Sequence, residues 1–151
     1  MIEYTILFFF YSFLGAVLEH LSYYFGGGTP KELSNPIITG FPLYGFGALL
    51  IIFINEKLKV MGWENNFLIQ FMFFGIALSV LEYLVGVYVG AGKDSYRNGR
   101  VSAWDYSNEF MNIDGKVSLR HFILWGILGI ILVRVNNYLI KKVRCMVNCN
   151  V

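Results

Sequence analysis

The chain has 151 residues, of which 56% are hydrophobic, 18% are aromatic and only 15% are charged. Soluble domains contain roughly 45–50% apolar and about 25% charged residues, so this chain has too few charges to cover a water-facing surface. With a mean hydropathy of +0.56, this scarcity of charge excludes a disordered chain, a nucleic-acid-binding domain and an ordinary soluble enzyme, and predicts a membrane protein surrounded by a lipid bilayer. The net charge of +2 predicts no particular partner.

Three apolar runs have the length of about 20 residues that a helix needs to cross a bilayer. They cover residues 4–25, 66–90 and 118–140. The first run has no basic segment before its apolar core and no small-residue cleavage site after it, so we expect it to persist as a helix rather than to be removed as a signal peptide.

A fourth span is predicted at residues 36–55, although its apolar core is shorter. Pro42, Gly45 and Gly47 lie in its first part, and a proline interrupts a helix interior. We therefore expect an irregular beginning to this span, with a re-entrant segment as the alternative. The predicted fold class is all-α: an integral membrane bundle of four transmembrane helices, forming a single domain over residues 1–151.

Four spans would place both termini on the same side of a cell membrane. The positive-inside rule compares the Lys and Arg residues on the two sides, and here the two counts are nearly even. We expect both termini in the cytoplasm. One side holds Lys57, Lys59, Arg134, Lys141, Lys142 and Arg144, and the other holds Lys31, Lys93, Arg97, Arg100, Lys116 and Arg120.

Two carboxylates, Glu19 and Glu82, lie inside predicted spans, where ionisable groups usually face the protein interior or a wet cavity. Small residues at helical spacing accompany both, so helices can approach closely and turn the carboxylates away from lipid. These groups are either buried structural residues or a substrate, ion or proton site, and Arg120 and His121 are candidate partners for them. The stripes are Ser12, Gly15 and Glu19; Gly75, Ser79, Glu82 and Gly86; and His121, Trp125 and Gly129.

The sequence contains none of the common catalytic or nucleotide-binding signatures. It has no phosphate loop, no Gly-x-Ser-x-Gly and no His-Glu-x-x-His, so an enzyme is not favoured. Its two cysteines, Cys145 and Cys149, lack the second pair that a zinc site needs, and we expect no metal and no cofactor.

Five motifs follow one another along the chain. One is segment 40–47, Gly-Phe-Pro-Leu-Tyr-Gly-Phe-Gly, and the others are Glu19; Glu82-Tyr83 with Gly86; Trp104-Asp105-Tyr106-Ser107 followed by Asn112-Ile113 and Gly115; and Trp125-Gly126. Together they resemble a family of small bacterial membrane proteins labelled putative ABC transporter permease (type IV), to which the animal transmembrane protein 229 group is similar. The signature of that family at segment 40–47 is Gly-Pro-x-Pro-Ile-Tyr-Gly-x-Gly. The chain departs from the family at Asn35-Pro36-Ile37, at Phe41, and in lacking a second acidic residue after Glu82-Tyr83.

The resemblance implies a polytopic protein of the bacterial inner membrane with a role in transport. Since the chain has no ATPase motif, an ABC role would require a separate nucleotide-binding subunit, and the small size favours a homo-oligomer. The alternatives are a membrane-embedded enzyme acting on a lipid or isoprenoid, and an accessory or structural subunit.

The motifs are expected to converge on one polar site that binds a small solute or lipid. Its predicted substrate- or ion-binding residues are Glu19, Tyr44, Glu82, Asp105, Tyr106, Asn112 and Trp125. Those expected to shape the backbone around it are Pro42, Gly45, Gly47, Gly75, Gly86, Trp104 and Gly115.

Overall fold

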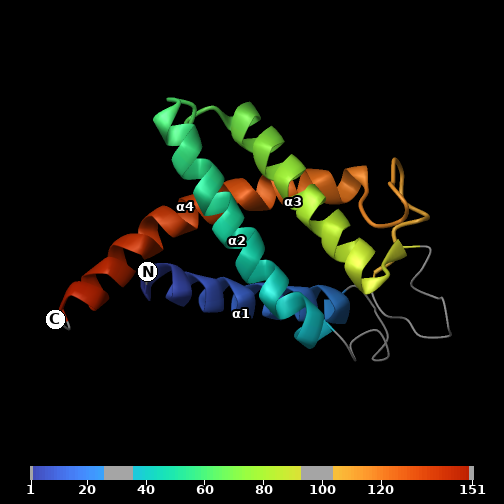
Figure 1. Ribbon diagram of the computed structural model, residues 1–151, viewed down its shortest axis with the longest axis horizontal. Coiled ribbons are helices and arrows are strands. Elements are labelled where there is room, and N and C mark those ends of the chain that lie inside the picture. Colours follow the sequence, from blue (N-terminus) through green and yellow to red (C-terminus); the bar gives the residue numbers. More distant parts are fainter. Residues whose placement is uncertain (1, 26–35, 93–103, 150–151) are drawn as a thin grey trace. The chain divides into compact units, whose positions relative to one another are not determined.

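The computed structural model describes residues 2–25, 36–92 and 104–149. Within them the chain forms four helices and no strand, apart from an isolated bridge between Ile113 and Val117. The all-helical fold class is therefore confirmed. The helices, in chain order, are α1 (Ile2–Phe25), α2 (Pro36–Val60), α3 (Phe67–Val89) and α4 (Leu119–Cys149) (Figure 1).

Three of the described helices are long and apolar enough to cross a membrane. The crossing segments are Ile2–Glu19, Phe67–Val89 and Leu119–Ile140. Their outward side chains are large and apolar, as with Phe9 in α1 (56% exposed) and Leu84 in α3 (61% exposed). Contiguous apolar surface of this extent is unfavourable in water and is expected in lipid, so the chain is a multi-pass membrane protein.

Helix α2 is continuous from Pro36 to Val60, with Pro42 inside it. The irregular or re-entrant beginning predicted for this span is not confirmed. Pro42 lies in the second turn of α2, where it removes the hydrogen bond of its amide to the carbonyl of Ile38 and its ring crowds that carbonyl, yet the helix continues through it. A crossing by α2 remains a prediction, and so does a bundle of four spans.

The chain forms two compact units. Unit one comprises Met1–Phe53 and Ile131–Val151. Its core contains Leu7 and Tyr11 of α1 with Ala48 and Ile52 of α2, packed against leucine and isoleucine side chains of α4. The Tyr11 hydroxyl donates to Oδ1 of Asn136, across 3.3 Å, and so satisfies both buried polar groups.

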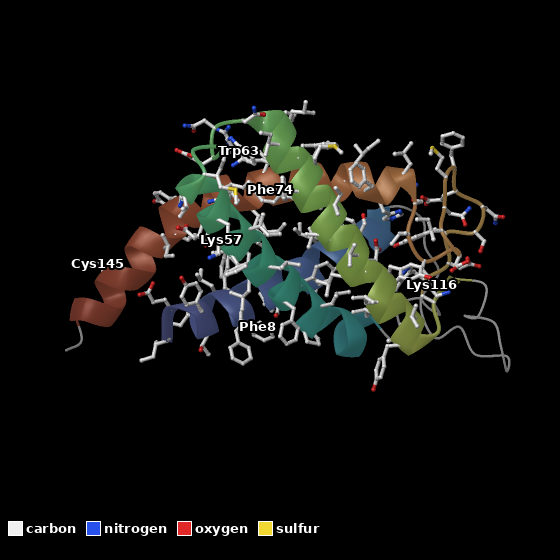
Figure 2. All side chains as sticks on the ribbon, turned by 45° about the horizontal axis from the view of Figure 1, so that its top comes forward. Phe8, Lys57, Trp63, Phe74, Lys116 and Cys145 are labelled. Atoms are coloured by element: carbon white, nitrogen blue, oxygen red, sulfur yellow. The ribbon has the colours of Figure 1, made fainter. Side chains whose placement is uncertain are left out.

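Unit two comprises Ile54–Ile130, and in it α3 packs closely on the first half of α4. Glycines make the approach close: Gly75 of α3 faces the ring of Phe122, while Gly126 and Gly129 of α4 face the rings of Phe71 and Phe74. Phe74, labelled in Figure 2, is fully buried. The small-residue stripes predicted on α3 and α4 are therefore packing faces.

The ends of α3 are determined by local sequence. Asn66 caps its N-terminus, since the side chain accepts a hydrogen bond from the amide of Ile69 at 3.1 Å. Its C-terminus is closed by Gly90, whose φ of 75° suits glycine and whose amide bonds to the carbonyl of Gly86. The basic residues Lys31, Lys93, Arg97 and Arg100, which enter the topology count, lie outside the described residues.

We expect Gly126→Ala to lower the stability of unit two by roughly 1–3 kcal/mol, as overpacking does. A Cβ at Gly126 would lie 2.6 Å from the Phe71 ring and 3.0 Å from the Phe71 carbonyl oxygen, which cannot move without displacing α3. Thermal unfolding in detergent measures the effect, with Ile127→Val, at a 43% exposed neighbour, as the control. Equal stability of the two variants would show that α3 and α4 are not this close.

Candidate functional site

The segment 104–118, here called the cap, precedes α4 and is built around two side chains that bond to its own backbone. Asp105 Oδ1 accepts from the amide of Ser107 at 2.9 Å and from its hydroxyl at 2.6 Å. Asn112 donates through Nδ2 to the carbonyls of Ser107 (3.1 Å) and Glu109 (2.9 Å), and accepts from the amide of Gly115 at 3.1 Å. The cap therefore has a defined conformation of its own.

Gly115 is required by this conformation. Its φ is 67°, and a Cβ there would collide with the Ser107 hydroxyl and lie 2.7 Å from Oδ1 of Asp105. Met111 and Asp114 also have positive φ angles, of 51° and 53°, which are uncommon outside glycine. The cap is thus a tight turn that the asparagine and aspartate side chains stabilise.

Two residues of α3, Gly86 and Tyr83, contact the cap. Gly86 leaves room for Trp104 and Lys116, since a Cβ at that glycine would lie 3.3 Å from each of them. The indole of Trp104 donates to the carbonyl of Lys116 at 2.8 Å. Next to Gly86 on the helix, the Tyr83 hydroxyl donates to Oδ2 of Asp114 at 2.9 Å. The cap therefore packs against the C-terminal end of α3 and is hydrogen-bonded to it.

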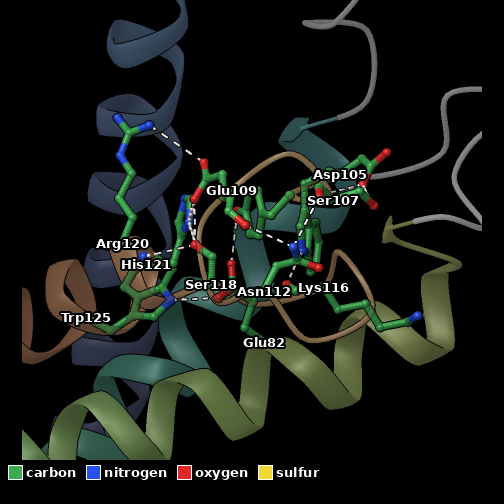
Figure 3. Close-up of polar contacts among 12 residues, drawn as sticks. Glu82, Asp105, Ser107, Glu109, Asn112, Lys116, Ser118, Arg120, His121 and Trp125 are labelled. Carbon is green, nitrogen blue, oxygen red and sulfur yellow. Dashed lines mark hydrogen bonds and ion pairs between the residues drawn. The ribbon is translucent and has the colours of Figure 1, made fainter.

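Glu82 lies at the centre of this arrangement and is 5% exposed. The indole Nε1 of Trp125, from α4, donates to its Oε2 at 2.7 Å, and the hydroxyl of Tyr106, from the cap, donates to its Oε1 at 3.1 Å (Figure 3). Among the described residues no lysine, arginine or histidine pairs with this carboxylate. A buried carboxylate in a membrane-crossing helix is thus held by neutral donors from two other segments.

A second carboxylate, Glu109, belongs to the cap and has a guanidinium, an imidazole and a hydroxyl as partners. It contacts Nδ1 of His121 at 3.2 Å, accepts from the Ser118 hydroxyl at 2.5 Å, and lies 3.6 Å from the Arg120 guanidinium (Figure 3). The ring of His121 stacks on Tyr106, with centroids 3.8 Å apart and planes 14° from parallel. The Glu109 cluster and Glu82 therefore share the Tyr106 side chain.

The Ser118, His121 and Glu109 side chains do not form a nucleophilic triad. In such a triad the serine and the carboxylate bind opposite nitrogens of the imidazole. Here both meet Nδ1, and the serine donates to the glutamate directly. Ser118 instead caps α4, since its Oγ accepts from the amide of His121 at 3.4 Å. Among the described residues, no group of three His, Cys, Asp or Glu side chains could hold a metal ion.

The structure brings together three of the seven residues predicted to bind substrate: Glu82, Tyr106 and Trp125. Asp105 and Asn112 lie in the cap and bond to its own groups. Glu19 and Tyr44 pair with each other in unit one, where the Tyr44 hydroxyl donates to Oε2 at 2.9 Å. A role in binding for these residues remains a prediction.

Two glycines of α2 that are expected to shape the backbone lie in packed positions. Gly45 of α2 faces Phe8 and the hydroxyl of Ser12, and the neighbouring Gly47 is buried. Gly15 of α1 faces the ring of Tyr44, so the predicted stripe from Ser12 to Glu19 is a packing face within unit one.

One pairing expected from the sequence is wrong. Arg120 and His121 were candidate partners for the carboxylates inside the spans, but both pair with Glu109 rather than with Glu82. Residues at the start of α4 point into the cap, whereas Trp125, one turn further, points at α3. Glu109 and Ser118 were not predicted as site residues. The sequence signal that could have indicated their contact with His121 is that Ser118 precedes this histidine by three residues at the start of a helix.

The long apolar helices and their lipid-compatible surfaces define a multi-pass membrane protein, and the buried Glu82 carboxylate lies in a helix long and apolar enough to cross a membrane. Residues 6–151 match the family described as Putative ABC-transporter type IV, and the chain belongs to this family. No curated protein and no solved structure gives a significant match to it.

We expect Asn112→Ala to loosen the cap without affecting the helices, because it removes three hydrogen bonds to the backbone and leaves their partners unsatisfied. The cost of roughly 1–3 kcal/mol corresponds to about five-fold or greater acceleration of amide exchange. Hydrogen–deuterium exchange of peptides covering 104–118 measures it. Asn65→Ala, at an exposed position of the α2–α3 connection, is the control, and unchanged protection in Asn112→Ala would contradict this role.

Proposed function

We propose that the chain is a transport-related membrane subunit in which Glu82, Tyr106 and Trp125 form the binding site for a small solute. One observation carries the proposal: Glu82 is 5% exposed inside a membrane-crossing helix, yet no cation pairs with it among the described residues. Burying such a group is costly, so intramembrane carboxylates usually mark substrate or ion pathways.

The two hydrogen-bond donors at Glu82 are of a kind that a bound solute could replace. Both are uncharged and each comes from a different segment, so a solute can replace one without leaving a buried unpaired charge of opposite sign. The Tyr106 bond, at 3.1 Å, is the longer of the two. Movement of the cap would break this bond and free Oε1, while Trp125 would continue to hold Oε2.

The family relation supports a transporter that works with other subunits. A separate nucleotide-binding subunit would supply ATP hydrolysis, and a homo-oligomer would complete a path across the bilayer. Within unit one, Glu19 and Tyr44 would contribute polar groups to binding, and within unit two Asp105 and Asn112 would do so. The protein would lie in the cell membrane with both termini in the cytoplasm.

We expect a solute that binds at this site to raise the thermal unfolding temperature of the wild type and to lose this effect in Glu82→Gln. The variant keeps the shape of the side chain but lacks the charge, and a hydrogen bond to a charged group contributes about 1.5–3 kcal/mol, which corresponds to a ten-fold or greater loss of affinity. Purified protein would be screened against amines, amino acids, sugars and short-chain lipids, and uptake of the stabilising solute would then be measured in proteoliposomes.

The control for this screen is Glu56→Gln, which changes an exposed carboxylate of α2 that pairs with Lys59. It is expected to behave as the wild type does. A solute that stabilises the wild type and Glu82→Gln equally would refute the proposed site. If Glu82→Gln unfolds at the same temperature as the wild type and no solute of any class stabilises the wild type, the protein is better described as an accessory subunit than as a solute-binding one.

Cytoplasmic termini are expected to protect Cys145 from reagents outside the cell. Its side chain is exposed and lies beyond the crossing segment Leu119–Ile140. In a Cys149→Ser background, a membrane-impermeant maleimide should label Cys145 only after the cells are permeabilised. Labelling in intact cells would place the C-terminus outside.

A further inference from the structure

We propose that Glu82 binds a proton on Oε1. The protonated carboxyl then donates a hydrogen bond to the Tyr106 hydroxyl, whereas the carboxylate accepts one from it. This inference rests on the proposed function and names its coupling ion. It concerns the contacts that join α3, the cap and α4 within unit two (Figure 3).

The first step is a comparison of the two carboxylates in the cluster. The side chain of Glu109 is 25% exposed and lies against the Arg120 guanidinium and the His121 ring, so its charge is compensated. Glu82 is 5% exposed and, within the part of the chain that the structure describes, accepts hydrogen bonds from an indole and a phenol. The charge on Glu82 is therefore more costly to bury than the charge on Glu109. Binding a proton neutralises Glu82, and a proton, unlike a larger ligand, needs no cavity.

The second step concerns which oxygen receives the proton. The indole of Trp125 is a donor only, so the oxygen that it faces, Oε2, cannot donate back to it. The hydroxyl of Tyr106 both donates and accepts, so a proton on Oε1 can be donated to it after the hydroxyl rotates. The geometry therefore favours protonation on Oε1.

The third step is the effect on the cap. A proton from water adds to the carboxylate, giving a neutral carboxyl, and no electrons are transferred. Before this step Tyr106 donates to a charged acceptor; afterwards it accepts from a neutral group, and charge-assisted bonds are roughly twice as strong as neutral ones. The hydroxyl proton of Tyr106 must turn to a different acceptor. Protonation thus weakens the attachment of the cap at its contact with α3.

The groups facing Glu82 belong to three segments. The cap contributes Tyr106 and the carboxylate of Glu109, whose like charge acts on Glu82. Helix α4 contributes the indole of Trp125, with His121 and Arg120 on the far side of Glu109. On α3 itself, the other buried residues are uncharged: Gln70, Phe74, Gly75 and Gly86.

The test is infrared difference spectroscopy of the full-length protein in lipid nanodiscs, comparing acidic with basic pH. On acidification every carboxyl group contributes a carbonyl band, so the test compares variants. We expect the wild type and the matched variant Glu109→Gln to share one component of this band that is missing from the difference spectrum of Glu82→Gln. A Glu82→Gln spectrum identical to that of the wild type would overturn the proposal.

Two further variants keep Glu82 and test which oxygen is protonated. With the proton on Oε1, the carbonyl oxygen is Oε2, which accepts from Trp125. Trp125→Phe should therefore shift the band to higher frequency by more than Tyr106→Phe does. A larger shift in Tyr106→Phe would place the proton on Oε2 and refute the proposed reversal.

The infrared experiment and the solute screen can fail independently of each other. A band assigned to Glu82 in a protein that no solute stabilises would support the proton site and refute solute binding. Solute binding that depends on Glu82, with no such band, would refute the proton site and leave the solute site standing.

Discussion

The carboxylate of Glu82 is the contact on which unit two depends. Its two oxygens receive hydrogen bonds from Trp125 of α4 and from Tyr106 of the cap, so one side chain joins three segments that are distant in sequence. The close packing of α3 on α4 through their glycines places the indole of Trp125 within reach. Removing either donor would leave a buried carboxylate oxygen without a partner, at a cost of about 1–3 kcal/mol or more.

The same cluster contains two carboxylates in different surroundings. Glu109 accepts a hydrogen bond from Ser118, the N-cap of α4, lies 3.6 Å from the Arg120 guanidinium and contacts the His121 ring. Glu82 has neutral partners and little contact with solvent. A charge left uncompensated inside a membrane span is unfavourable for stability, and this is the physical basis for the proposal that Glu82 binds a ligand or a proton.

Much of this fold could be predicted from the sequence because apolar length and small-residue spacing determine it. The runs at 66–90 and 118–140 became α3 and α4, and the stripe that contains Gly75, Glu82 and Gly86 is buried as expected. Helix α2 continues through Pro42, although a proline at that position loses a backbone hydrogen bond and crowds the preceding turn, so proline alone did not predict the course of this segment.

The partners of the carboxylates could not be predicted in the same way. They depend on the conformation of the cap, where Met111 and Asp114 adopt positive φ angles that no periodic pattern encodes. Glu109 meets Ser118 and His121 only because that turn reverses the chain direction. Asp105 and Asn112 carry suitable groups for a binding site, yet their bonds are directed into the turn itself.

The most direct test of the central claim is the indole N–H resonance of Trp125 in nuclear magnetic resonance spectra of the protein in detergent or nanodiscs. A hydrogen bond of 2.7 Å to a carboxylate should move this proton downfield of the indole protons of Trp63 and Trp104 and slow its exchange with water. Glu82→Gln should shift it upfield, whereas Glu109→Gln should leave it nearly unchanged. A Trp125 resonance that is insensitive to Glu82→Gln would contradict the account.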